Sequence, residues 1–598
     1  MRLKPIPAAA FAIGAWSIWA AAQTPDPLPA VARRVEHLEA RVESVESVRA
    51  IKRLQSAYGH YVELGLWNDF ADLFAEDAVT NYQSGVRGKN AIRQLFFEQV
   101  GRGKLGLAEG RIYPHILFQP VITLAPEGRS AKGRWRILAM LGGYGGSATW
   151  YSGVYENEYV REGGVWKISV IHSEPKVTAA YSAAGWKDSG VHVPFHFTAA
   201  SVTRPVPEAS LPGSASRGAT PSLASLADRV RQLARRAARL NDQAEVTNLQ
   251  DTYGYAVDGK LWGQAADLFG EDGTLELGLQ GVYVGKASIR RAFDQFGPPG
   301  LRDGERNDHV YLQTIASVGP DGRTAQARGV ELILSSAPGG RNGELSEGVF
   351  ENTFVRQAAA KRGSTWKIQS VHFYPRMIVD ATAGWAKSAK PAPGPSREFP
   401  PDRPPTASYE IYPKFAVAPF HFDNPVTGKP PQYPEGVLPI VASASGAVAS
   451  RAATVASGPP IRNAADLDAA LAEAERRLTR AEAYDAAENL IGAYGYYLDE
   501  SPDGAAGLFA RPARTTSSEC SIFVNQILQP IVDVAPDGQS AKFRARRLDL
   551  GGTSGGPGYW SAGTFEGRIV SEQGAWKFEE ARSVAGWSAP YPGGWARP

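Results

Sequence analysis

The chain has 598 residues, 43% of them hydrophobic and 21% charged, which is the composition of soluble globular domains. This length allows three or four domains, each able to bury a core of its own. The formal net charge is only +3, and no basic stripe is interleaved with aromatic residues, so the sequence excludes a nucleic-acid-binding protein.

The first 22 residues have the pattern of a secretory signal. Arg2 and Lys4 are basic, residues 6–19 form an apolar run, and Ala20-Ala21-Ala22 forms a small-residue cleavage site before Gln23. The alternative is an uncleaved anchor, but the apolar run is shorter than the ~20 residues that span a bilayer. We therefore predict a bacterial periplasmic or secreted protein without a membrane segment after cleavage. The single cysteine, Cys520, excludes an intrachain disulfide and a metal–thiolate cluster.

An apolar ladder with steps of four and three residues occurs three times. The ladders begin at Val31, Leu226 and Leu467, in each case 27 residues before the tyrosine of a Tyr-Gly motif. Such a narrow stripe is the seam of a coiled coil, so each helix needs a partner. Either the three helices form one bundle, or each packs on its own domain, since two or three heptads are marginal alone.

The Tyr-Gly motif and the segments after it also occur three times. The motif reads Tyr58-Gly59-His60-Tyr61-Val62-Glu63, then Tyr253-Gly254-Tyr255-Ala256-Val257-Asp258, then Tyr494-Gly495-Tyr496-Tyr497-Leu498-Asp499. A turn follows at Gly128, Gly322 and Gly538, a Trp-Lys pair at Trp166, Trp366 and Trp576, and a Gly-Trp pair at Trp186, Trp385 and Trp587. Recurrence in one order indicates a tandem array.

In chain order, repeat one predicts helices first and strands afterwards. We expect a long helix to residue 64, a short helix over 67–75, a strand near Val79 and a helix over 90–100. Four antiparallel strands follow, over 112–124, 131–141, 150–160 and 165–171. Helices grouped before hairpin-linked strands indicate an α+β fold.

Low-complexity segments divide the chain into domains. We predict a signal peptide (1–22), repeat one (31–197), a linker (198–222), repeat two (223–386), a Pro/Ala-rich linker (387–465) and a degenerate repeat three (466–598). Two near-identical islands, Pro194-Phe195-His196-Phe197 and Pro419-Phe420-His421-Phe422, stand out. We expect both to dock as short edge strands on a neighbouring surface, with packed histidines.

The motifs carry a family resemblance. Repeat two combines the Tyr-Gly motif with Trp262, Gly285-Lys286, His309, Gly348-Val349-Phe350-Glu351-Asn352 and Trp366-Lys367-Ile368, and repeat one matches at Gly88-Lys89 and His115. In these positions the chain resembles the SnoaL-like branch of the nuclear transport factor 2-like superfamily. The resemblance covers nearly all of the three repeats. It implies tandem cone-shaped α+β barrels, each a curved antiparallel sheet wrapped on a long helix and each preceded by a heptad helix.

The resemblance also suggests catalytic residues. In scytalone dehydratase and hexachlorocyclohexane dehydrochlorinase, a carboxylate near the end of the first helix orients a histidine that removes a proton from a small apolar substrate. The matching pairs are Asp258 with His309 and Glu63 with His115, whereas repeat three has Asp499 with Asn525. A carboxylate that accepts the imidazole N–H fixes the tautomer and raises basicity, as a general base requires. The alternative is a half-buried histidine with a structural hydrogen bond.

Further residues could line a pocket for a flat apolar ligand. They are Tyr58, Tyr253, Trp67, Trp262, and the strand-end histidines His172 and His372. Aromatic residues at helical spacing also suit a core, which is the alternative for the first four. No three potential ligands have a recognised metal-site spacing, and we predict neither a metal nor a cofactor.

Two functions are consistent with the sequence. The first is an exported enzyme that removes a proton from a small, cyclic, apolar substrate without a cofactor, in the manner of a dehydratase or isomerase. The second is a non-catalytic periplasmic binding or scaffold protein, because the superfamily includes both. The expected partner is a small-molecule ligand. With three repeats in one chain, we predict an intrachain pseudo-trimer of cones that is otherwise monomeric.

Overall fold

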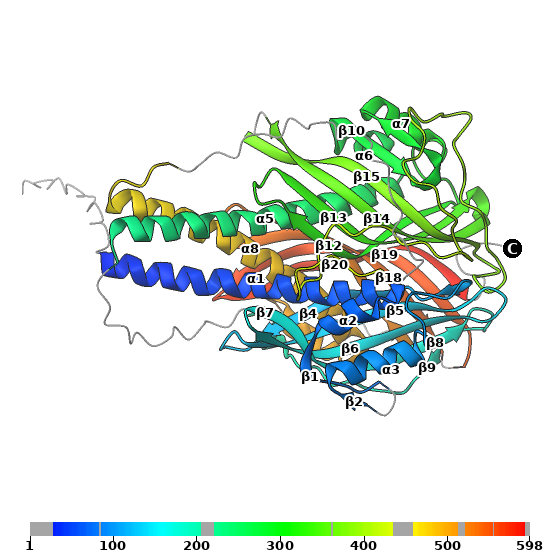
Figure 1. The fold of residues 1–598 in the computed structure, drawn as a ribbon, viewed down its shortest axis with the longest axis horizontal. Coiled ribbons are helices and arrows are strands. Elements are labelled where there is room, and N and C mark those ends of the chain that lie inside the picture. The colour runs from blue at the N-terminus through cyan, green and yellow to red at the C-terminus, as the bar shows by residue number, and fades with distance from the viewer. Residues whose placement is uncertain are drawn as a thin grey trace, which may run out of the picture.

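The computed structural model describes residues 28–82, 85–204, 221–359, 363–433, 459–511, 521–553 and 555–591. The predicted signal peptide and Cys520 lie outside these ranges. Three long helices project together from one end of the molecule, and three curved sheets surround them at the other end (Figure 1). Within the described ranges, no helix is both long enough and apolar enough to cross a membrane.

Repeat one contains every element that the sequence predicts, with ends that differ by a few residues. Its elements are α1 (Leu28–Leu64), α2 (Trp67–Asp72), β1 (Phe74–Thr80), β2 (Val86–Arg87), α3 (Lys89–Gln99), β3 (Arg111–Ile112), β4 (His115–Leu124), β5 (Ser130–Gly143), β6 (Ala148–Glu162), β7 (Val165–Ile171), β8 (Ser173–Ala180), β9 (Lys187–Asp188) and α4 (Ala199–Val202). The prediction missed β8, which continues the direction of β7 and also pairs with β6.

Repeat two has the same order of elements. It comprises α5 (Leu223–Asp258), α6 (Trp262–Asp267), β10 (Phe269–Leu277), η1 (Gly278–Gln280), β11 (Val282–Val284), α7 (Lys286–Asp294), β12 (Arg306–Val318), β13 (Thr324–Ala337), η2 (Pro338–Gly340), β14 (Arg341–Ala359) and β15 (Gly363–Asp380). Repeat three is shorter. It comprises α8 (Ala464–Glu500), α9 (Pro502–Ala505), η3 (Ala506–Leu508), β16 (Ile522–Val524), β17 (Ile527–Val534), β18 (Ser540–Gly552), β19 (Gly558–Glu572) and β20 (Ala575–Tyr591).

The sheets confirm the predicted α+β cones. Hairpins join the long strands, and the predicted turns close between the backbone N–H of Gly128 and Ala125, of Gly322 and Gly319, and of Gly538 and Ala535. The first strand of repeats one and two pairs in parallel with a late strand, β1 with β7 and β10 with β15. In repeat three a single parallel bridge between Phe509 and Phe578 occupies this place.

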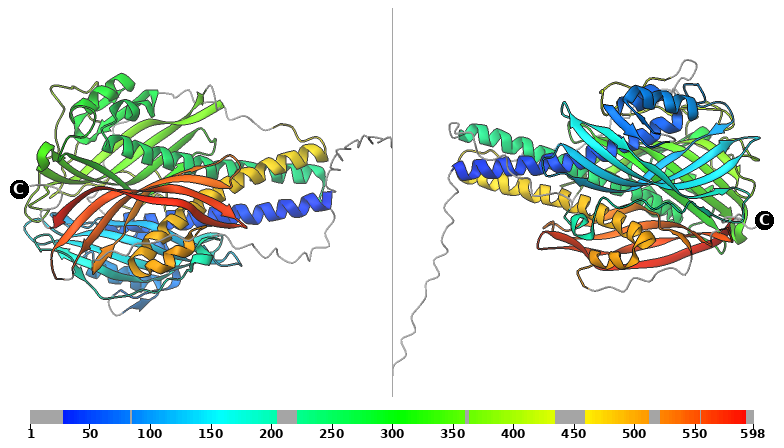
Figure 2. Two further views of the ribbon diagram at one scale, coloured as in Figure 1. Left: turned by 180° about the vertical axis from the view of Figure 1, so that it is seen from behind. Right: turned by 90° about the horizontal axis from the view of Figure 1, so that it is seen from below.

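The leading halves of α1, α5 and α8 lie side by side as a three-helix bundle (Figure 2). The ladder residues of all three helices share one hydrophobic core, which includes Val35, Val230 and Leu471. Bidentate ion pairs join α1 to α8 and α5 to α1; they are Arg34–Glu475, Arg41–Glu482, Arg229–Glu39 and Arg236–Glu46. Partly exposed pairs add little stability, but they select which helices become neighbours.

The glycine of each Tyr-Gly motif faces a glutamine from another repeat. Gln119, Gln313 and Gln529 all have left-handed backbone conformations at strand bulges, with φ of 55°, 55° and 47°. A Cβ on Gly59 would lie 2.2 Å from Gln313 Oε1, and a Cβ on Gly495 would lie 2.5 Å from Gln119 Nε2. Gln313 accepts a hydrogen bond from the Leu117 backbone at 2.8 Å. The glycines therefore allow one repeat to hydrogen-bond to the next.

The segment over 387–433 was expected to be part of a linker, but it packs against the repeats. Its residues Val417 and Phe422 are buried in the core of repeat one. Both Phe-His-Phe tails, residues 193–197 and 418–422, dock as expected, with buried histidine side chains. The prediction of edge strands is wrong, since neither tail has regular secondary structure. Their contacts are made by side chains and single carbonyl groups.

Candidate functional site

Repeat two encloses a cavity of 220 Å³ between its sheet and its helices. The walls are largely apolar and include Tyr253, Trp262, Phe293, Leu277 and Ile333, with Ala392 and Pro393 of the following segment. Its polar residues are Asn307, His309, Tyr311, Glu331, Ser335, Ser346, Gln280 and Glu344. A mostly apolar cavity with few polar groups is the usual form of a small-ligand site. Of the predicted site residues, it brings together Tyr253, Trp262 and His309.

His309 and Glu331 are hydrogen-bonded to each other in this cavity. The Nδ1 atom of His309 lies 2.6 Å from Glu331 Oε1. Glu331 is on β13, opposite Tyr311 and two residues from Ile333, which pairs with His309. Side chains two residues apart share a face of a sheet, so this register places the carboxylate beside the imidazole. Burial and the nearby Glu331 carboxylate raise the pKa of Tyr311.

Asp258 is not the side-chain partner of His309. It accepts a hydrogen bond from the backbone N–H of His309 at 2.6 Å, and its other oxygen pairs with Arg546 of repeat three. The predicted side-chain pair is therefore wrong. The end of α5 places the Asp258 carboxylate against the backbone of β12, and Glu331 is hydrogen-bonded to the imidazole.

Glu63 and Asp499, the matching carboxylates, also pair with another repeat. Glu63 lies 3.2 Å from Arg376 of repeat two, and Asp499 lies 2.5 Å from Arg136 of repeat one. Burial opposes ionisation of Glu63, but Arg376 and His60 hold its pKa at about 2. For Asp499, burial outweighs Arg136 and raises the pKa. Together with the Asp258–Arg546 pair, these pairs form a ring around the three repeats. An arginine of repeat two pairs with repeat one, an arginine of repeat three pairs with repeat two, and an arginine of repeat one pairs with repeat three.

The arginine of repeat two reaches its partner from a different strand. Repeats one and three carry Arg136 on β5 and Arg546 on β18, whereas the corresponding residue of β13 is Val330. Arg376 on β15 supplies the cation instead, and it also pairs with Glu347. Repeat two thus makes the same inter-repeat ion pair with an arginine at a different position of its sheet.

The interior of repeat one is filled with aromatic side chains. His115 Nε2 lies 2.8 Å from the Tyr155 hydroxyl, and its ring stacks on Tyr113 at 5.6 Å. Burial lowers the pKa of His115 to about 3. Its Nδ1 has no hydrogen-bond partner among the described residues. The predicted Glu63–His115 pair is therefore absent, and the predicted ligand contacts Tyr58 and Trp67 are fully buried in the core.

The strand-end histidines do not line the cavity of repeat two. His172 is partly exposed and lies 3.1 Å from Glu174. His372 stacks on Tyr374 at 3.8 Å, and burial lowers its pKa to about 3. Its neighbours Val371 and Phe373 line the cavity. Since successive side chains of a strand face opposite ways, His372 faces away from it.

Repeat three lacks the histidine. Asn525 stands at its position, with its backbone and side-chain amides both donating to Asp499 at 2.7 Å. No group of three or more His, Cys, Asp or Glu side chains could hold a metal ion within the described part of the chain.

The sequence reasoning missed Glu331. A comparison of the three repeats position by position contains the signal, because Ile137 and Arg547 occupy the corresponding places. An acid between Val330 and Leu332 in one repeat marks a local difference. The prediction instead looked for a carboxylate at the helix end, where all three repeats have one.

Comparison with known proteins identifies the domains. A family model described as SnoaL-like domain matches residues 43–172 and 238–372. Both regions are SnoaL-like domains. No curated protein matches the chain.

Solved structures similar to part of the chain include the following three. One is assigned as a scytalone dehydratase from Novosphingobium aromaticivorans DSM 12444, with 20% identity over 25% of this chain and 98% of that chain and a TM-score of 0.22. Another is hexachlorocyclohexane dehydrochlorinase LinA-type3 from Novosphingobium barchaimii LL02, with 19% identity over 26% and 98% and a TM-score of 0.21. A third is ActVI-ORFA from Streptomyces coelicolor, with 21% identity over 22% and 95% and a TM-score of 0.19.

Proposed function

We propose that repeat two binds a small, apolar, cyclic molecule and that His309 removes a proton from it. The observation that carries this proposal is the 2.6 Å contact between His309 and Glu331 in an apolar cavity of 220 Å³. An apolar cavity of about 150 Å³ holds a benzene-sized molecule, so this one suits a ring with substituents. The reaction class is dehydratase- or isomerase-like, without a cofactor.

The geometry assigns a role to each group. Glu331 accepts the Nδ1–H of His309, which leaves the lone pair on Nε2 and stabilises the imidazolium once the proton arrives. The electrons of the broken C–H bond form a double bond in the ligand. In an elimination a leaving group departs with its electron pair, and in an isomerisation the proton returns at another carbon. Asn307, Ser335 and Ser346 offer hydrogen bonds to a polar substituent.

Solvent exchange tests the proposal without knowledge of the product. Small cyclic compounds are first screened for a rise in melting temperature, because a ligand that binds the folded state stabilises it. Compounds that bind are then incubated in D₂O and followed by NMR. We expect the protein to catalyse deuterium incorporation and His309→Gln to bind without catalysing it. Binding with equal exchange in both proteins would contradict the role of His309.

The second candidate is a non-catalytic scaffold. The observation that favours it is the ring of inter-repeat ion pairs, which uses all three helix-end carboxylates for assembly. We assign this role to repeats one and three and the ligand to repeat two. Failure of every cyclic compound to raise the melting temperature would favour a scaffold throughout.

We also propose export and a monomeric pseudo-trimer. The N-terminal sequence supports cleavage after Ala22, so the exported protein should begin at Gln23. Mass spectrometry of the exported form tests this, and an intact Met1 on it would contradict the proposal.

A further inference from the structure

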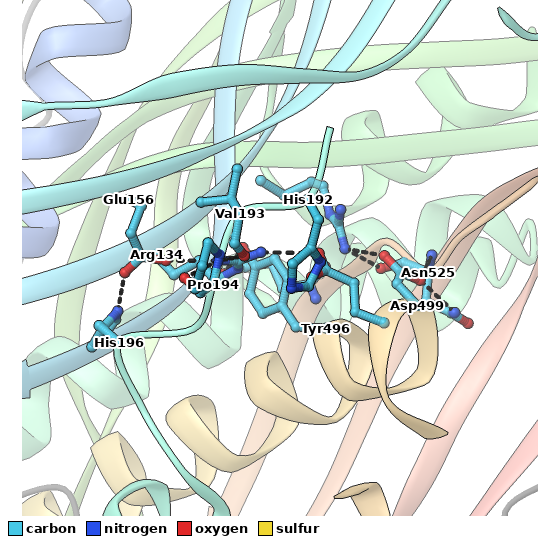
Figure 3. A network of polar contacts seen from close by, with 12 residues as sticks. Arg134, Glu156, His192, Val193, Pro194, His196, Tyr496, Asp499 and Asn525 are labelled. Carbon is cyan, nitrogen blue, oxygen red and sulfur yellow. Dashed lines mark hydrogen bonds and ion pairs between the residues drawn. The ribbon is translucent and has the colours of Figure 1, made fainter. Parts of the chain in front are cut away.

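The Phe-His-Phe tail of repeat one docks on an arginine–glutamate pair of its own sheet (Figure 3). Arg134 pairs with Glu156 at 2.7 Å and donates to the carbonyls of Val193 and Pro194 at 3.1 and 3.3 Å. Its guanidinium lies between Phe195 and Tyr496 of α8, 4.7 and 5.0 Å from the ring centroids.

The histidine of this tail completes the contact. The Nδ1 atom of His196 bonds to Glu156, so that carboxylate has both the arginine and the histidine as partners. Phe197 packs edge-on against Tyr497, again on the helix of repeat three. The tail therefore fills a groove between the sheet of one repeat and the helix of another.

The tail of repeat two makes equivalent contacts at the interface between the sheet of repeat two and the helix of repeat one. Arg328 pairs with Glu351 at 2.7 Å and donates to the Pro419 carbonyl at 2.7 Å. Its guanidinium lies 3.9 Å from the centroid of the Phe420 ring. His421 Nδ1 lies 2.8 Å from Glu351. In this case the neighbouring helix is α1, which contributes Tyr61 at 5.8 Å from Phe420.

The third interface has the same arginine and glutamate, with Ala256 where the occupied interfaces have Tyr497 and Tyr61, and no tail lies on it among the described residues. Arg544 pairs with Glu566 at 2.6 Å, and the helix of repeat two places Tyr255 where α8 has Tyr496. The Arg544 side chain is 54% exposed, whereas those of Arg134 and Arg328 are 0% exposed. Arg582 bonds to Glu566 in place of the tail histidine and is itself exposed.

The surface around this interface is also uncovered. Leu261, which precedes α6 of repeat two, is 43% exposed, whereas the corresponding Leu66 of repeat one is 2% exposed. Leu66 belongs to a hydrophobic cluster with Val417 and Phe422 of the second tail segment. On β20, Val584 is a further large exposed apolar residue.

We propose that the interface between repeats three and two is a binding site for an extended peptide of another protein, with proline before a Phe-His-Phe triplet. The same molecule binds the same Pro-Phe-His-Phe sequence at two equivalent interfaces, which specifies this occupant. The first ring stacks on the Arg544 guanidinium, the two preceding carbonyls accept its N–H groups, and the histidine donates to Glu566. Arg582, on the open surface, moves aside.

A synthetic peptide tests the proposal. A fluorescent decapeptide with the sequence of residues 191–200 is titrated with the whole protein, and its anisotropy is measured. We expect saturable binding with one site per molecule, because the two resident tails are held at high local concentration and do not exchange. Arg544→Ala should weaken binding about tenfold or more, the loss expected for charge-assisted hydrogen bonds.

Two controls make the test specific. Arg568→Ala removes another half-exposed arginine of the same sheet, which pairs with Glu579 at 2.6 Å, and should leave binding unchanged. A peptide with both phenylalanines replaced by serine should not bind. Absence of saturable binding would overturn the proposal, and so would equal affinity for the unaltered protein and for Arg544→Ala.

Discussion

Two carboxylates lie next to His309, and they have different roles. Glu331 contacts the imidazole, whereas Asp258 holds the backbone and pairs with Arg546. We predict that Glu331→Gln lowers the rate of ligand deuterium exchange by about 10²-fold or more, because a neutral partner stabilises the imidazolium poorly. Asp258→Asn should change this rate little but lower stability by up to about 3 kcal/mol, since the buried Arg546 then keeps only Asp308, 3.3 Å away, as an anionic partner. NMR exchange and urea unfolding separate the two effects; an exchange rate lost only in Asp258→Asn would reverse the assignment.

Asp549 gives stability a pH dependence. Burial raises its pKa to about 7 although Arg547 lies 2.7 Å away. Between pH ~4 and ~7 the folded protein keeps a proton that the unfolded chain has released, so the free energy of unfolding falls as the pH rises. Above the folded pKa this loss, of the order of 4 kcal/mol, is complete.

Asp549→Asn should remove this loss, because asparagine resembles the protonated acid and does not titrate. We expect urea unfolding to show a variant that gains stability over the unaltered protein from pH 4.5 to pH 8. Parallel pH profiles for the two proteins would show that Asp549 ionises normally in the fold.

Among individual residues, the sequence identified His309, Tyr253 and Trp262 because their types and their order in the motifs are distinctive. It could not identify Glu331 as the partner, since that depends on the register of β12 against β13. It also could not show that Glu63, Asp258 and Asp499 pair with arginines, because these come from other repeats.

The bulges and helices fit together through the glycines of the Tyr-Gly motifs. A Cβ on Gly254 would lie 2.6 Å from the Tyr311 ring and 2.9 Å from Gln529. We predict that Gly254→Ala lowers the free energy of unfolding by about 1–3 kcal/mol through overpacking. Gly263→Ala in α6 is the matched control, since nothing lies within 4 Å of its Cβ. It should be neutral or slightly stabilising. Equal losses in urea unfolding would mean that glycine flexibility, not space, matters at both positions.

The arginine of repeat two joins two elements across an interface. The Arg376 side chain, which is 14% exposed, lies between Glu63 and Glu347. We expect Arg376→Met to lower the free energy of unfolding by about 3–5 kcal/mol, because two carboxylates then lack their cation. Arg87→Met removes an exposed arginine 3.7 Å from Asp77 and should cost less than about 1 kcal/mol. If the two variants unfold at the same urea concentration, the ring of ion pairs does not stabilise the assembly.

Elements were predictable where the signal was local. Helix periodicity, the turn glycines and the Trp-Lys pairs placed the helices and most strands of repeat one within a few residues. β8 was missed because the strand is interrupted at His172, where the prediction ended the last strand. The tails were expected as edge strands, but their aromatic and charged side chains make the contacts, and alternation along the sequence gives no sign of this.

As a whole, the molecule divides its tasks unequally among three similar domains. Repeat two keeps a cavity with a histidine–carboxylate pair, repeat one has filled its interior with aromatic side chains, and repeat three has Asn525 and a shortened fold. What all three keep is the ladder helix, the bulge glutamine and the helix-end carboxylate. These are the parts that contact another repeat, so contact between repeats explains why they are present even where no pocket is.

The number and order of the repeats could be read from the sequence, because the ladders and motifs recur in one order. The direction of the ring could not be read, since it depends on which arginine reaches which carboxylate. In repeat two that arginine is Arg376, which stands outside the aligned position, so no alignment of the repeats would have indicated it.

Small-angle X-ray scattering of the mature protein tests the arrangement of the three cones most directly. For a single compact particle of this length the radius of gyration is about 25 Å, and the projecting helix bundle adds a few Å. We predict a value in this range, with one main maximum in the pair-distance distribution. An extended profile with several maxima, as separate domains on linkers would give, would contradict the common axis and the ring of ion pairs built around it.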